Sequence, residues 1–347
     1  MAPSLTTVRG LERYHRILTG ESRARRDILR RIPVDIDSEA DLTELWREHD
    51  VAMAHYRELL TDDDALTVLT PRTNNLLGLK LEICHRLMHS CKLCENRCAV
   101  DRISGELGKC RCGREARIAS RFIHMHEEME LVPSLTVFFS GCNARCCFCQ
   151  NWDISQDSFS GIVLTGEEIG RGLDEYHELG VKNVNWVGGE PTPHIHTVIS
   201  SLLNSKSSLP VVWNSNMYLS REAMALLSGV VDIYLTDFKF GNDDCAVRYS
   251  GMEDYWETVT RNHISASQDA EILIRHLVLP DNLECCSIPI LKWVAENLGP
   301  GTRVNVMGQY RPAGDTGRCE ELQRRLQDSE ISYILDSARN LGLDNIV

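Results

Sequence analysis

The chain has 347 residues, of which 43% are hydrophobic and 25% are charged, a composition typical of globular proteins. Its net charge of -13 repels polyanions, so we expect no nucleic acid partner. No run reaches the roughly 20 apolar residues of a membrane span, and residues 1–18 lack the apolar core of a signal peptide. We therefore predict a cytoplasmic protein without a membrane partner, in which the 14 cysteines serve metal binding or catalysis rather than disulfides.

Residues 1–90 have the periodicity of helices, most clearly at 41–60 and 75–88. We predict an N-terminal helical region that lies over the active site as a lid. Its basic residues are interleaved with acidic ones, which is typical of a solvated helix face. They are Arg23, Arg25, Arg26, Arg30 and Arg31.

Residues 91–130 are predicted to be a cysteine-rich knuckle followed by a linker. The knuckle has C-x2-C-x3-C-x11-C spacing, with Cys112 as a spare thiol. Four thiolates at such spacing suit either a zinc ion or an auxiliary iron-sulfur cluster, and the sequence leaves both open. The four predicted ligands are Cys91, Cys94, Cys98 and Cys110.

Residues 131–310 alternate between strands and helices, which predicts parallel strands joined by crossover helices. Six strands indicate a partial (β/α)6 barrel rather than a complete one of eight. Residues 311–347 are predicted to be a helical tail. The six strands are expected at 135–140, 183–187, 209–213, 231–235, 272–278 and 303–306.

The unusual polar segments of this region follow the predicted strands. Ligands of such barrels bind in the loops at the C-terminal ends of the strands, so these segments are expected to line one mouth. In chain order they are GCNARCCFCQN (141–151), GGEP (188–191), NSN (214–216), DFK (237–239), RHLVLP (275–280) and MGQYRP (307–312).

The first of these segments holds three thiols in C-x3-C-x2-C spacing: Cys142, Cys146 and Cys149. Three thiolates on one loop suit three irons of a cubane cluster and leave the fourth iron open to another ligand. A structural zinc ion needs four ligands, and no fourth is obvious nearby. Cys147 is out of register and is predicted to be a packed bystander.

This pattern, with the aromatic Phe148 before the last cysteine, resembles the radical S-adenosylmethionine (SAM) superfamily. Gly188, Gly189 and Glu190 match the family motif that binds the amino group of SAM. The resemblance implies a [4Fe-4S] cluster that chelates SAM and cleaves it to a 5'-deoxyadenosyl radical. Across residues 88–313 the chain is similar to the branch of pyruvate formate-lyase activating enzyme.

Other mouth residues are predicted to contact SAM or the substrate. Lys239 and Arg275 suit the SAM carboxylate or a substrate anion, with structural salt bridges as the alternative. Asn214 and Ser215 are predicted to bind the ribose or carboxylate of SAM, and Met307 its adenine. We predict Lys239, Arg275 and Tyr310 as the catalytic residues; His276 and Arg311 are expected beside them.

The predicted function is hydrogen abstraction from a small polar metabolite by a radical SAM enzyme. Resemblance to natural-product enzymes favours a lyase that decarboxylates a sugar-nucleoside carboxylate of the cytosylglucuronate type in antibiotic biosynthesis. The alternative is an activating enzyme that installs a glycyl radical on a partner protein. Either function requires an external one-electron donor of the flavodoxin or ferredoxin type.

Overall fold

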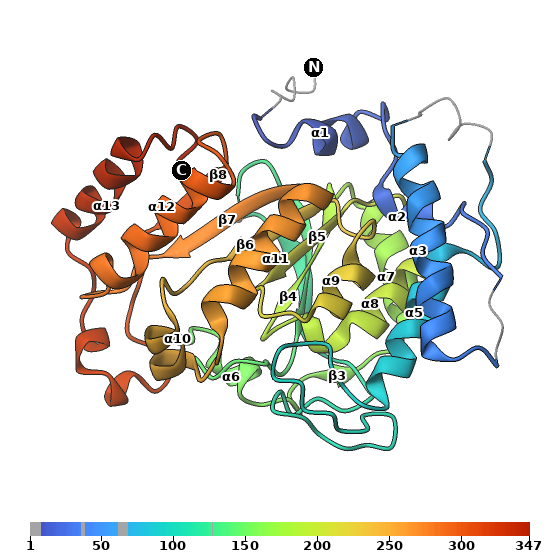
Figure 1. The fold of residues 1–347 in the computed structure, drawn as a ribbon, viewed down its shortest axis with the longest axis horizontal. Coiled ribbons are helices and arrows are strands. Elements are labelled where there is room, and N and C mark those ends of the chain that lie inside the picture. Colours follow the sequence, from blue (N-terminus) through green and yellow to red (C-terminus); the bar gives the residue numbers. More distant parts are fainter. Residues whose placement is uncertain (1–7, 36–38, 62–68, 127) are drawn as a thin grey trace.

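A curved eight-stranded sheet forms the centre of the molecule (Figure 1). The computed structural model describes residues 8–35, 39–61, 69–126 and 128–347. The strands lie in the order β3-β1-β2-β4-β5-β6-β7-β8. Their bounds are β1 Arg117–His124, β2 Ser134–Phe139, β3 Ile162–Val163, β4 Asn183–Gly188, β5 Val211–Ser215, β6 Ile233–Asp237, β7 Glu271–Leu277 and β8 Arg303–Met307.

Six consecutive strands of this sheet, β2 and β4 to β8, are parallel. The predicted six-stranded partial barrel is therefore confirmed. Each strand begins and ends within two residues of its predicted bounds. The antiparallel strands β1 and β3 extend one edge of the sheet and were not predicted.

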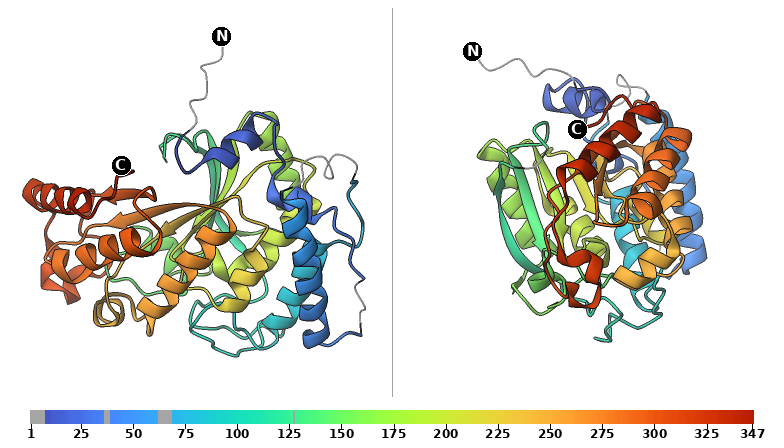
Figure 2. Two further views of the ribbon diagram at one scale, coloured as in Figure 1. Left: turned by 45° about the horizontal axis from the view of Figure 1, so that its top comes forward. Right: turned by 90° about the vertical axis from the view of Figure 1, so that its left-hand side faces the viewer.

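The crossover helices pack on the outer face of the sheet (Figures 1 and 2). The first of them, α7, begins at a capping box, in which Thr165 and Glu168 each accept a hydrogen bond from the other's backbone N–H. Ser220 likewise caps α9 by accepting a hydrogen bond from Ala223 N. The helices are α7 Gly166–Glu178, α8 Ile195–Asn204, α9 Arg221–Leu227, α10 Asp243–Ser250, α11 Tyr255–Asp269 and α12 Ile288–Asn297.

Helices of the N-terminal region form a further layer outside α8 and α9. They are α2 Arg25–Leu29, α3 Leu42–Leu59 and α5 Leu76–Met88, whereas α1 Glu12–Leu18 lies apart from this layer. The two long ones agree with the predicted helices at 41–60 and 75–88. α5 packs against both α3 and α8, and its residues from Leu76 to Met88 contribute eight buried side chains.

The interpretation of the arginine cluster as a solvated face is wrong. The side chain of Arg26 is fully buried and donates to the carbonyl oxygens of Leu202 and Ser207 at the end of α8. Arg25 is also buried, and its guanidinium donates to the Tyr56 hydroxyl over 2.9 Å. These arginines attach the N-terminal region to the barrel because each guanidinium offers several donors to oxygens that no water reaches.

Helix α1 closes the N-terminal end of the barrel. The Asn183 amide, at the start of β4, donates to the Tyr14 hydroxyl over 2.7 Å. The Glu271 carboxylate, at the start of β7, accepts from Arg13 N and Tyr14 N. Because the predicted mouth lies at the opposite ends of the strands, the prediction of a lid is wrong for α1.

The C-terminal segment is helical only in part. After two 3-10 turns at Thr316–Arg318 and Glu320–Gln323, it forms α13 Asp328–Asn340 and ends in a parallel bridge between Ile346 and Val304 of β8. A short helix, α6 Trp152–Ser155, follows the cysteine loop. Among the described residues, no helix is both long and apolar enough to cross a membrane.

Candidate active site

A cavity of about 340 Å³ lies at the C-terminal ends of the parallel strands. Its wall is built by the loops that follow β2, β4 and β6, together with side chains at the ends of β5 and β7. The predicted site residues that line it are Cys142, Cys146, Phe148, Cys149, Gly188, Gly189, Glu190, Asn214, Lys239 and Arg275. The structure therefore gathers most of the predicted mouth around one space.

The cysteine loop separates its thiols as its spacing predicts. Cys142, Cys146 and Cys149 face the cavity, whereas Cys147 lies outside it, with its sulfur 3.6 Å from that of Cys319. Among the described residues, these three cavity sulfurs do not all lie within 4.8 Å of one another. A cubane binds each thiolate at a separate iron, so its ligands need not lie that close together.

Hydrogen-bond donors surround the sulfur of Cys142. It accepts from Ala144 N over 3.4 Å and is 3.9 Å from the Asn216 amide nitrogen. Burial raises the pKa of the Cys142 thiol and that of Cys146, the latter to about 12. A buried thiolate therefore requires a bound cation, and the donor set fits an iron-sulfur cluster held by Cys142, Cys146 and Cys149.

The glycine pair after β4 is required by close packing. A Cβ atom on Gly188, whose φ is +128°, would lie 2.2 Å from Phe139 N. One on Gly189 would lie 2.1 Å from the carbonyl oxygen of Gly141, which begins the cysteine loop. A side chain on Gly188 would push β4 away from β2, and one on Gly189 would push the cysteine loop away, so both glycines set the shape of the cavity.

Glu190 is a buried carboxylate held by four hydrogen bonds. Its oxygens accept from the Thr192 hydroxyl and the Ser215 hydroxyl, each over 2.6 Å, and from Thr192 N and Asn216 N. Burial raises its pKa, against the effect of these hydrogen bonds. A carboxylate fixed in this way at a cavity wall is suited to accept from a ligand ammonium. The structure thus gives Ser215 a positioning contact with Glu190 rather than a place on the wall.

Lys239 and Arg275 reach the cavity, but each has an acidic partner. Lys239 pairs with Asp237, and the Nε of Arg275 lies 3.4 Å from an oxygen of Glu128. Burial alone would lower the pKa of Lys239, yet the negative charges of Asp237, Cys146 and Glu190 together raise it. Both predicted readings, anion binding and salt bridge, are therefore compatible with their positions.

Besides Ser215, four of the predicted mouth residues do not line the cavity. The Tyr310 hydroxyl donates to the Leu322 carbonyl oxygen over 2.6 Å, and its ring packs behind Phe148. His276 points to the outer side, where its ring bonds the Phe238 carbonyl and the Ser287 hydroxyl. Met307 and Arg311 are also absent from the wall.

The sequence reasoning missed a polar layer inside the barrel. Thr136 of β2 pairs with Asn185 of β4, two residues before Phe138 and Val187, which line the cavity. Side chains two residues apart on a strand share a face, so Thr136 and Asn185 point into the barrel just below the cavity. Both are fully buried, and among the described residues neither side-chain oxygen, nor the Asn185 amide nitrogen, has a hydrogen-bond partner. Polar residues at inward strand positions were the available signal.

The cysteine-rich knuckle lies beside the cysteine loop. The Leu93 carbonyl oxygen accepts a hydrogen bond from Ser220 N. The backbone of Cys94 forms an isolated antiparallel β-bridge with Leu219, in the segment after β5. The Asn96 amide donates to the Asn143 carbonyl oxygen over 2.7 Å and lies 3.7 Å from the Cys94 sulfur. One side chain therefore connects a predicted knuckle ligand to the residue that follows Cys142.

The knuckle encloses a buried arginine side chain. Arg102 is fully buried, donates to the carbonyl oxygens of Gly113 and Pro193, and lies 3.9 Å from the sulfur of Cys91. The Cys98 sulfur accepts from Lys109 N over 3.3 Å. Among the described residues this guanidinium pairs with no carboxylate, and the negative charge of thiolates in a metal-bound knuckle would stabilise it. Cys112 instead lies 3.7 Å from the Ser140 carbonyl oxygen.

Comparison with known proteins agrees with this geometry. The family model of the radical SAM superfamily matches residues 136–285, which include the cysteine loop and the glycine pair. A protein of Methanocaldococcus jannaschii, the uncharacterized protein MJ0674, is 42% identical over 88% of this chain and 90% of its own length. The chain belongs to the radical SAM superfamily.

Two further relatives of this radical SAM protein have named activities. The 7-carboxy-7-deazaguanine synthase of Clostridium acetobutylicum is 31% identical over 30% of the chain. The GTP 3',8-cyclase of Staphylococcus epidermidis is 22% identical over 58% of the chain. The matches span about half the length of each, 48% and 49%. Membership implies that the protein binds SAM and a [4Fe-4S] cluster and uses an electron donor; a decarboxylase activity is not shown.

Proposed function

We propose that this radical SAM enzyme acts on a small, polar, anionic molecule bound inside the barrel. The observation that carries the proposal is the buried pair Thr136 and Asn185, whose polar atoms have no partner among the described residues. Unpaired buried polar groups cost about 1–3 kcal/mol each, and a polar ligand that extended below the cavity to these side chains would recover that cost. An apolar substrate would leave that cost in place.

When bound, the cluster and SAM supply a 5'-deoxyadenosyl radical that abstracts hydrogen from the substrate. Cys142, Cys146 and Cys149 hold the cluster at the cavity wall. Glu190 accepts hydrogen bonds from the amino group of SAM, and the burial of this carboxylate strengthens the interaction. Asn214, which also lines the cavity, is placed to bind SAM's ribose or carboxylate.

Lys239 and Arg275 give the substrate region its positive groups. Both line the cavity, and Arg275 pairs along the sheet with Asp237 on one side and Asn305 on the other. A bound carboxylate would share these cations with Asp237 and Glu128, so the substrate is held by a network rather than by one ion pair. A sugar-nucleoside carboxylate has the required hydroxyls and anion, and its decarboxylation is the reaction that we propose within this class.

The knuckle is proposed to hold an auxiliary iron-sulfur cluster through Cys91, Cys94, Cys98 and Cys110. Thiolates on one zinc ion lie about 3.8 Å apart, given Zn–S bonds of about 2.3 Å. Among the described residues, no three knuckle sulfurs lie within 4.8 Å of one another. A cubane binds each thiolate at a separate iron and does not need the sulfurs to lie that close together. Iron and zinc analysis of a Cys142/Cys146/Cys149 triple alanine variant tests this choice, because residual iron supports the cluster and zinc alone contradicts it.

The experiment that tests the function is anaerobic release of 5'-deoxyadenosine in the presence of dithionite. Carboxylated sugars and nucleosides are compared with their uncharged analogues, and products are identified by mass. Faster release with the carboxylated compounds, together with loss of CO₂ from one of them, is the expected result. Release that depends instead on a partner protein, with one SAM consumed per activation, would favour the activating enzyme suggested by the resemblance to pyruvate formate-lyase activase.

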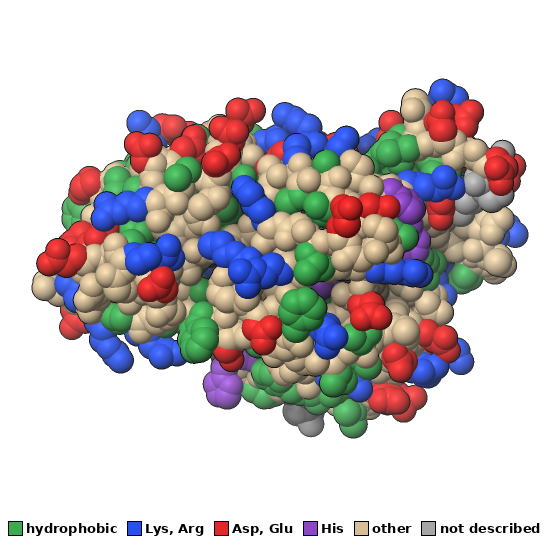
Figure 3. Space-filling model, turned by 90° about the horizontal axis from the view of Figure 1, so that it is seen from below, with side chains coloured by type: hydrophobic (Ala, Val, Ile, Leu, Met, Phe, Trp, Pro, Cys, Tyr) green, Lys and Arg blue, Asp and Glu red, His purple; other side chains and the backbone are tan. Residues whose placement is uncertain are grey.

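An external one-electron donor of the flavodoxin or ferredoxin type is part of the proposal. Figure 3 shows the molecule from the side on which the knuckle loop lies in Figure 1, and basic and acidic side chains are interspersed over this face. Charges of both signs on one face favour an oriented, transient encounter over tight binding.

A further inference from the structure

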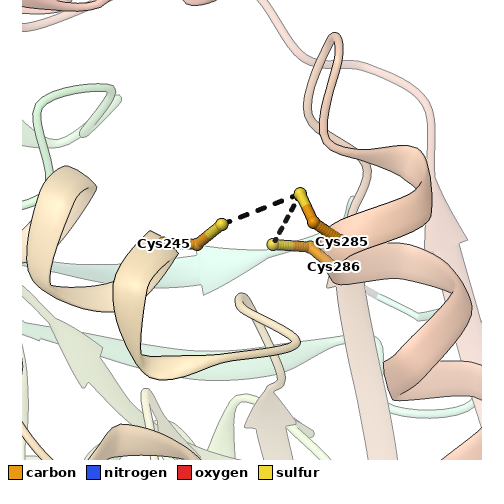
Figure 4. Close-up of side chains that lie close together, drawn as sticks. All are labelled: Cys245, Cys285 and Cys286. Atoms are coloured by element: carbon orange, nitrogen blue, oxygen red, sulfur yellow. Dashed lines mark hydrogen bonds between the residues drawn. The ribbon is translucent and has the colours of Figure 1, made fainter.

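A second group of thiols lies outside the cavity and the knuckle. Cys245 belongs to α10, which follows β6, and Cys285 and Cys286 belong to the π-helical turn Leu283–Ser287, which follows β7. Figure 4 shows the three side chains pointing toward one another across the gap between these elements. Forty residues of sequence separate the two sides, so only the fold brings them together.

The distances between these sulfurs are those of ligands to one metal ion. The sulfur of Cys285 lies 3.7 Å from that of Cys245 and 3.9 Å from that of Cys286, and all three lie within 4.8 Å of one another. Thiolates at tetrahedral zinc lie about 3.8 Å apart, given Zn–S bonds of about 2.3 Å. Among the described residues, this is the set of three potential ligands that meets such a spacing.

The backbone around the thiols is fixed before any ion binds. The Asn242 side chain accepts from Cys245 N and donates to the Cys285 carbonyl oxygen, each over 2.8 Å, so it joins both segments. A Cβ atom on Gly241 would lie 2.5 Å from the Cys285 carbonyl oxygen, which shows how closely the two segments pack. A site held in this way loses little conformational entropy on binding.

A fourth donor points at the same space. Asn282 is buried, with a relative exposure of 3%. Its amide nitrogen is fixed because it donates a hydrogen bond to the Pro280 carbonyl oxygen over 2.8 Å. The amide oxygen is therefore directed at the sulfurs, 3.5 Å from Cys285 and 3.8 Å from Cys245. An oxygen in this position completes a four-ligand S3O set.

We propose that Cys245, Cys285 and Cys286 bind one zinc ion, with the Asn282 amide oxygen as the fourth ligand. Binding releases the thiol protons to solvent and changes no oxidation state. Cys285 is exposed, so the ion has access from outside. The ion would tie α10, which follows the loop that carries Lys239, to the turn that follows β7, the strand that carries Arg275. It would in this way help to hold both cavity cations in place.

The test is the zinc content of the anaerobically reconstituted full-length protein after incubation with Zn²⁺ and removal of loose metal. Cys245→Ser/Cys285→Ser is expected to hold about one zinc ion fewer per chain than the wild type. Cys319→Ser, which removes a buried thiol elsewhere, is the matched control and should not lower the zinc content. Co²⁺ in place of Zn²⁺ should give thiolate-to-cobalt absorption that the double variant loses.

The single variant Cys285→Ser keeps the test valid if the double variant folds poorly, because its side chain is exposed. It should bind Zn²⁺ at least tenfold more weakly at this site. Equal Zn²⁺ affinity of wild type and folded Cys285→Ser, measured by competition with a chelator, would overturn the proposal. A Cys245–Cys285 disulfide in peptide maps of the anaerobic protein would also overturn it. Neither outcome bears on SAM cleavage, so this proposal and the proposed function fail separately.

Discussion

At the scale of single residues, the neighbours Cys146 and Cys147 show how one position decides a role. Cys146 lines the cavity, while Cys147 N donates to the Tyr249 carbonyl oxygen and its sulfur faces Cys319. The spacing C-x3-C-x2-C was enough to separate them, because only one register places three thiols on one side of the loop. The sequence could not show the partner of Cys147, since Cys319 is 172 residues away.

Alanine variants of the loop thiols are therefore expected to behave differently. Cys142→Ala, Cys146→Ala and Cys149→Ala should each lower 5'-deoxyadenosine release at least 100-fold, because three thiolates are needed to hold the cluster. Cys147→Ala should keep most of the activity. Iron content and anaerobic 5'-deoxyadenosine release measure both effects. Equal activity of the Cys146 and Cys147 variants would refute the ligand assignment.

Gly189 offers a test of the close approach between β4 and the cysteine loop. Gly189→Ala should lower SAM binding at least tenfold, since its Cβ atom would lie 2.1 Å from the Gly141 carbonyl oxygen. Gly317→Ala is the control, because nothing lies within 4 Å of its Cβ position. SAM affinity by equilibrium dialysis distinguishes the two variants. Unchanged SAM affinity in Gly189→Ala would mean that the cysteine loop can move away from the added Cβ atom without weakening SAM binding.

At the scale of elements, α1 covers the N-terminal end of the barrel. Leu11 and Tyr14 pack with Leu131, Ile233 and Leu273 in a small apolar cluster there. The periodicity of the N-terminal region predicted its helices but not the end of the barrel that they cover. Both ends of a parallel barrel present mixed apolar and polar groups. Only the tertiary contacts therefore show whether a helix covers the N-terminal end or lies over the active site.

Tyr14→Phe separates these two roles. It removes the hydroxyl that accepts from the Asn183 amide and leaves a buried N–H unpaired, which should cost about 1–3 kcal/mol of unfolding free energy. Tyr333→Phe is the control, with an exposed hydroxyl that bonds Glu284, and should change stability by less than about 0.5 kcal/mol. Urea unfolding measures both. 5'-Deoxyadenosine release by Tyr14→Phe should stay within twofold of wild type at 25 °C. A loss of activity without a loss of stability would instead support a lid role for α1.

At the scale of the whole molecule, the parallel core was predictable and its additions were not. The six parallel strands are short segments rich in apolar and β-branched residues that recur between helical segments, and this alternation marks them in the sequence. β1 has a mixed burial pattern and β3 has only two residues, so neither has a clear period. The zinc-spaced thiols were missed for another reason: Cys245 and the pair Cys285–Cys286 have no local spacing, and their meeting depends on two adjacent crossover connections.

The attachment of the N-terminal helices to the barrel includes a fully buried lysine. Lys80 of α5 donates to the Ala225 carbonyl oxygen in α9 and lies 2.8 Å from the Nε2 atom of His49 in α3. Burial lowers the pKa of Lys80 from 10.5 to about 7 and that of His49 to about 3. One side chain thus connects three helices and takes part in the joining of the two regions.

This lysine makes the stability of the molecule depend on pH. Between about pH 7 and 10 the unfolded chain holds the Lys80 proton and the folded chain does not, so the unfolding free energy rises with pH, by at most about 1.4 kcal/mol per unit. Below pH 7 both states are protonated and the cost of burying the charge is constant. His49 is neutral in both states above pH 7, so it adds nothing to the slope there. Lys80→Met should flatten the rise between pH 7 and 9 in urea unfolding, whereas parallel curves for the two proteins would show that Lys80 stays charged in the fold.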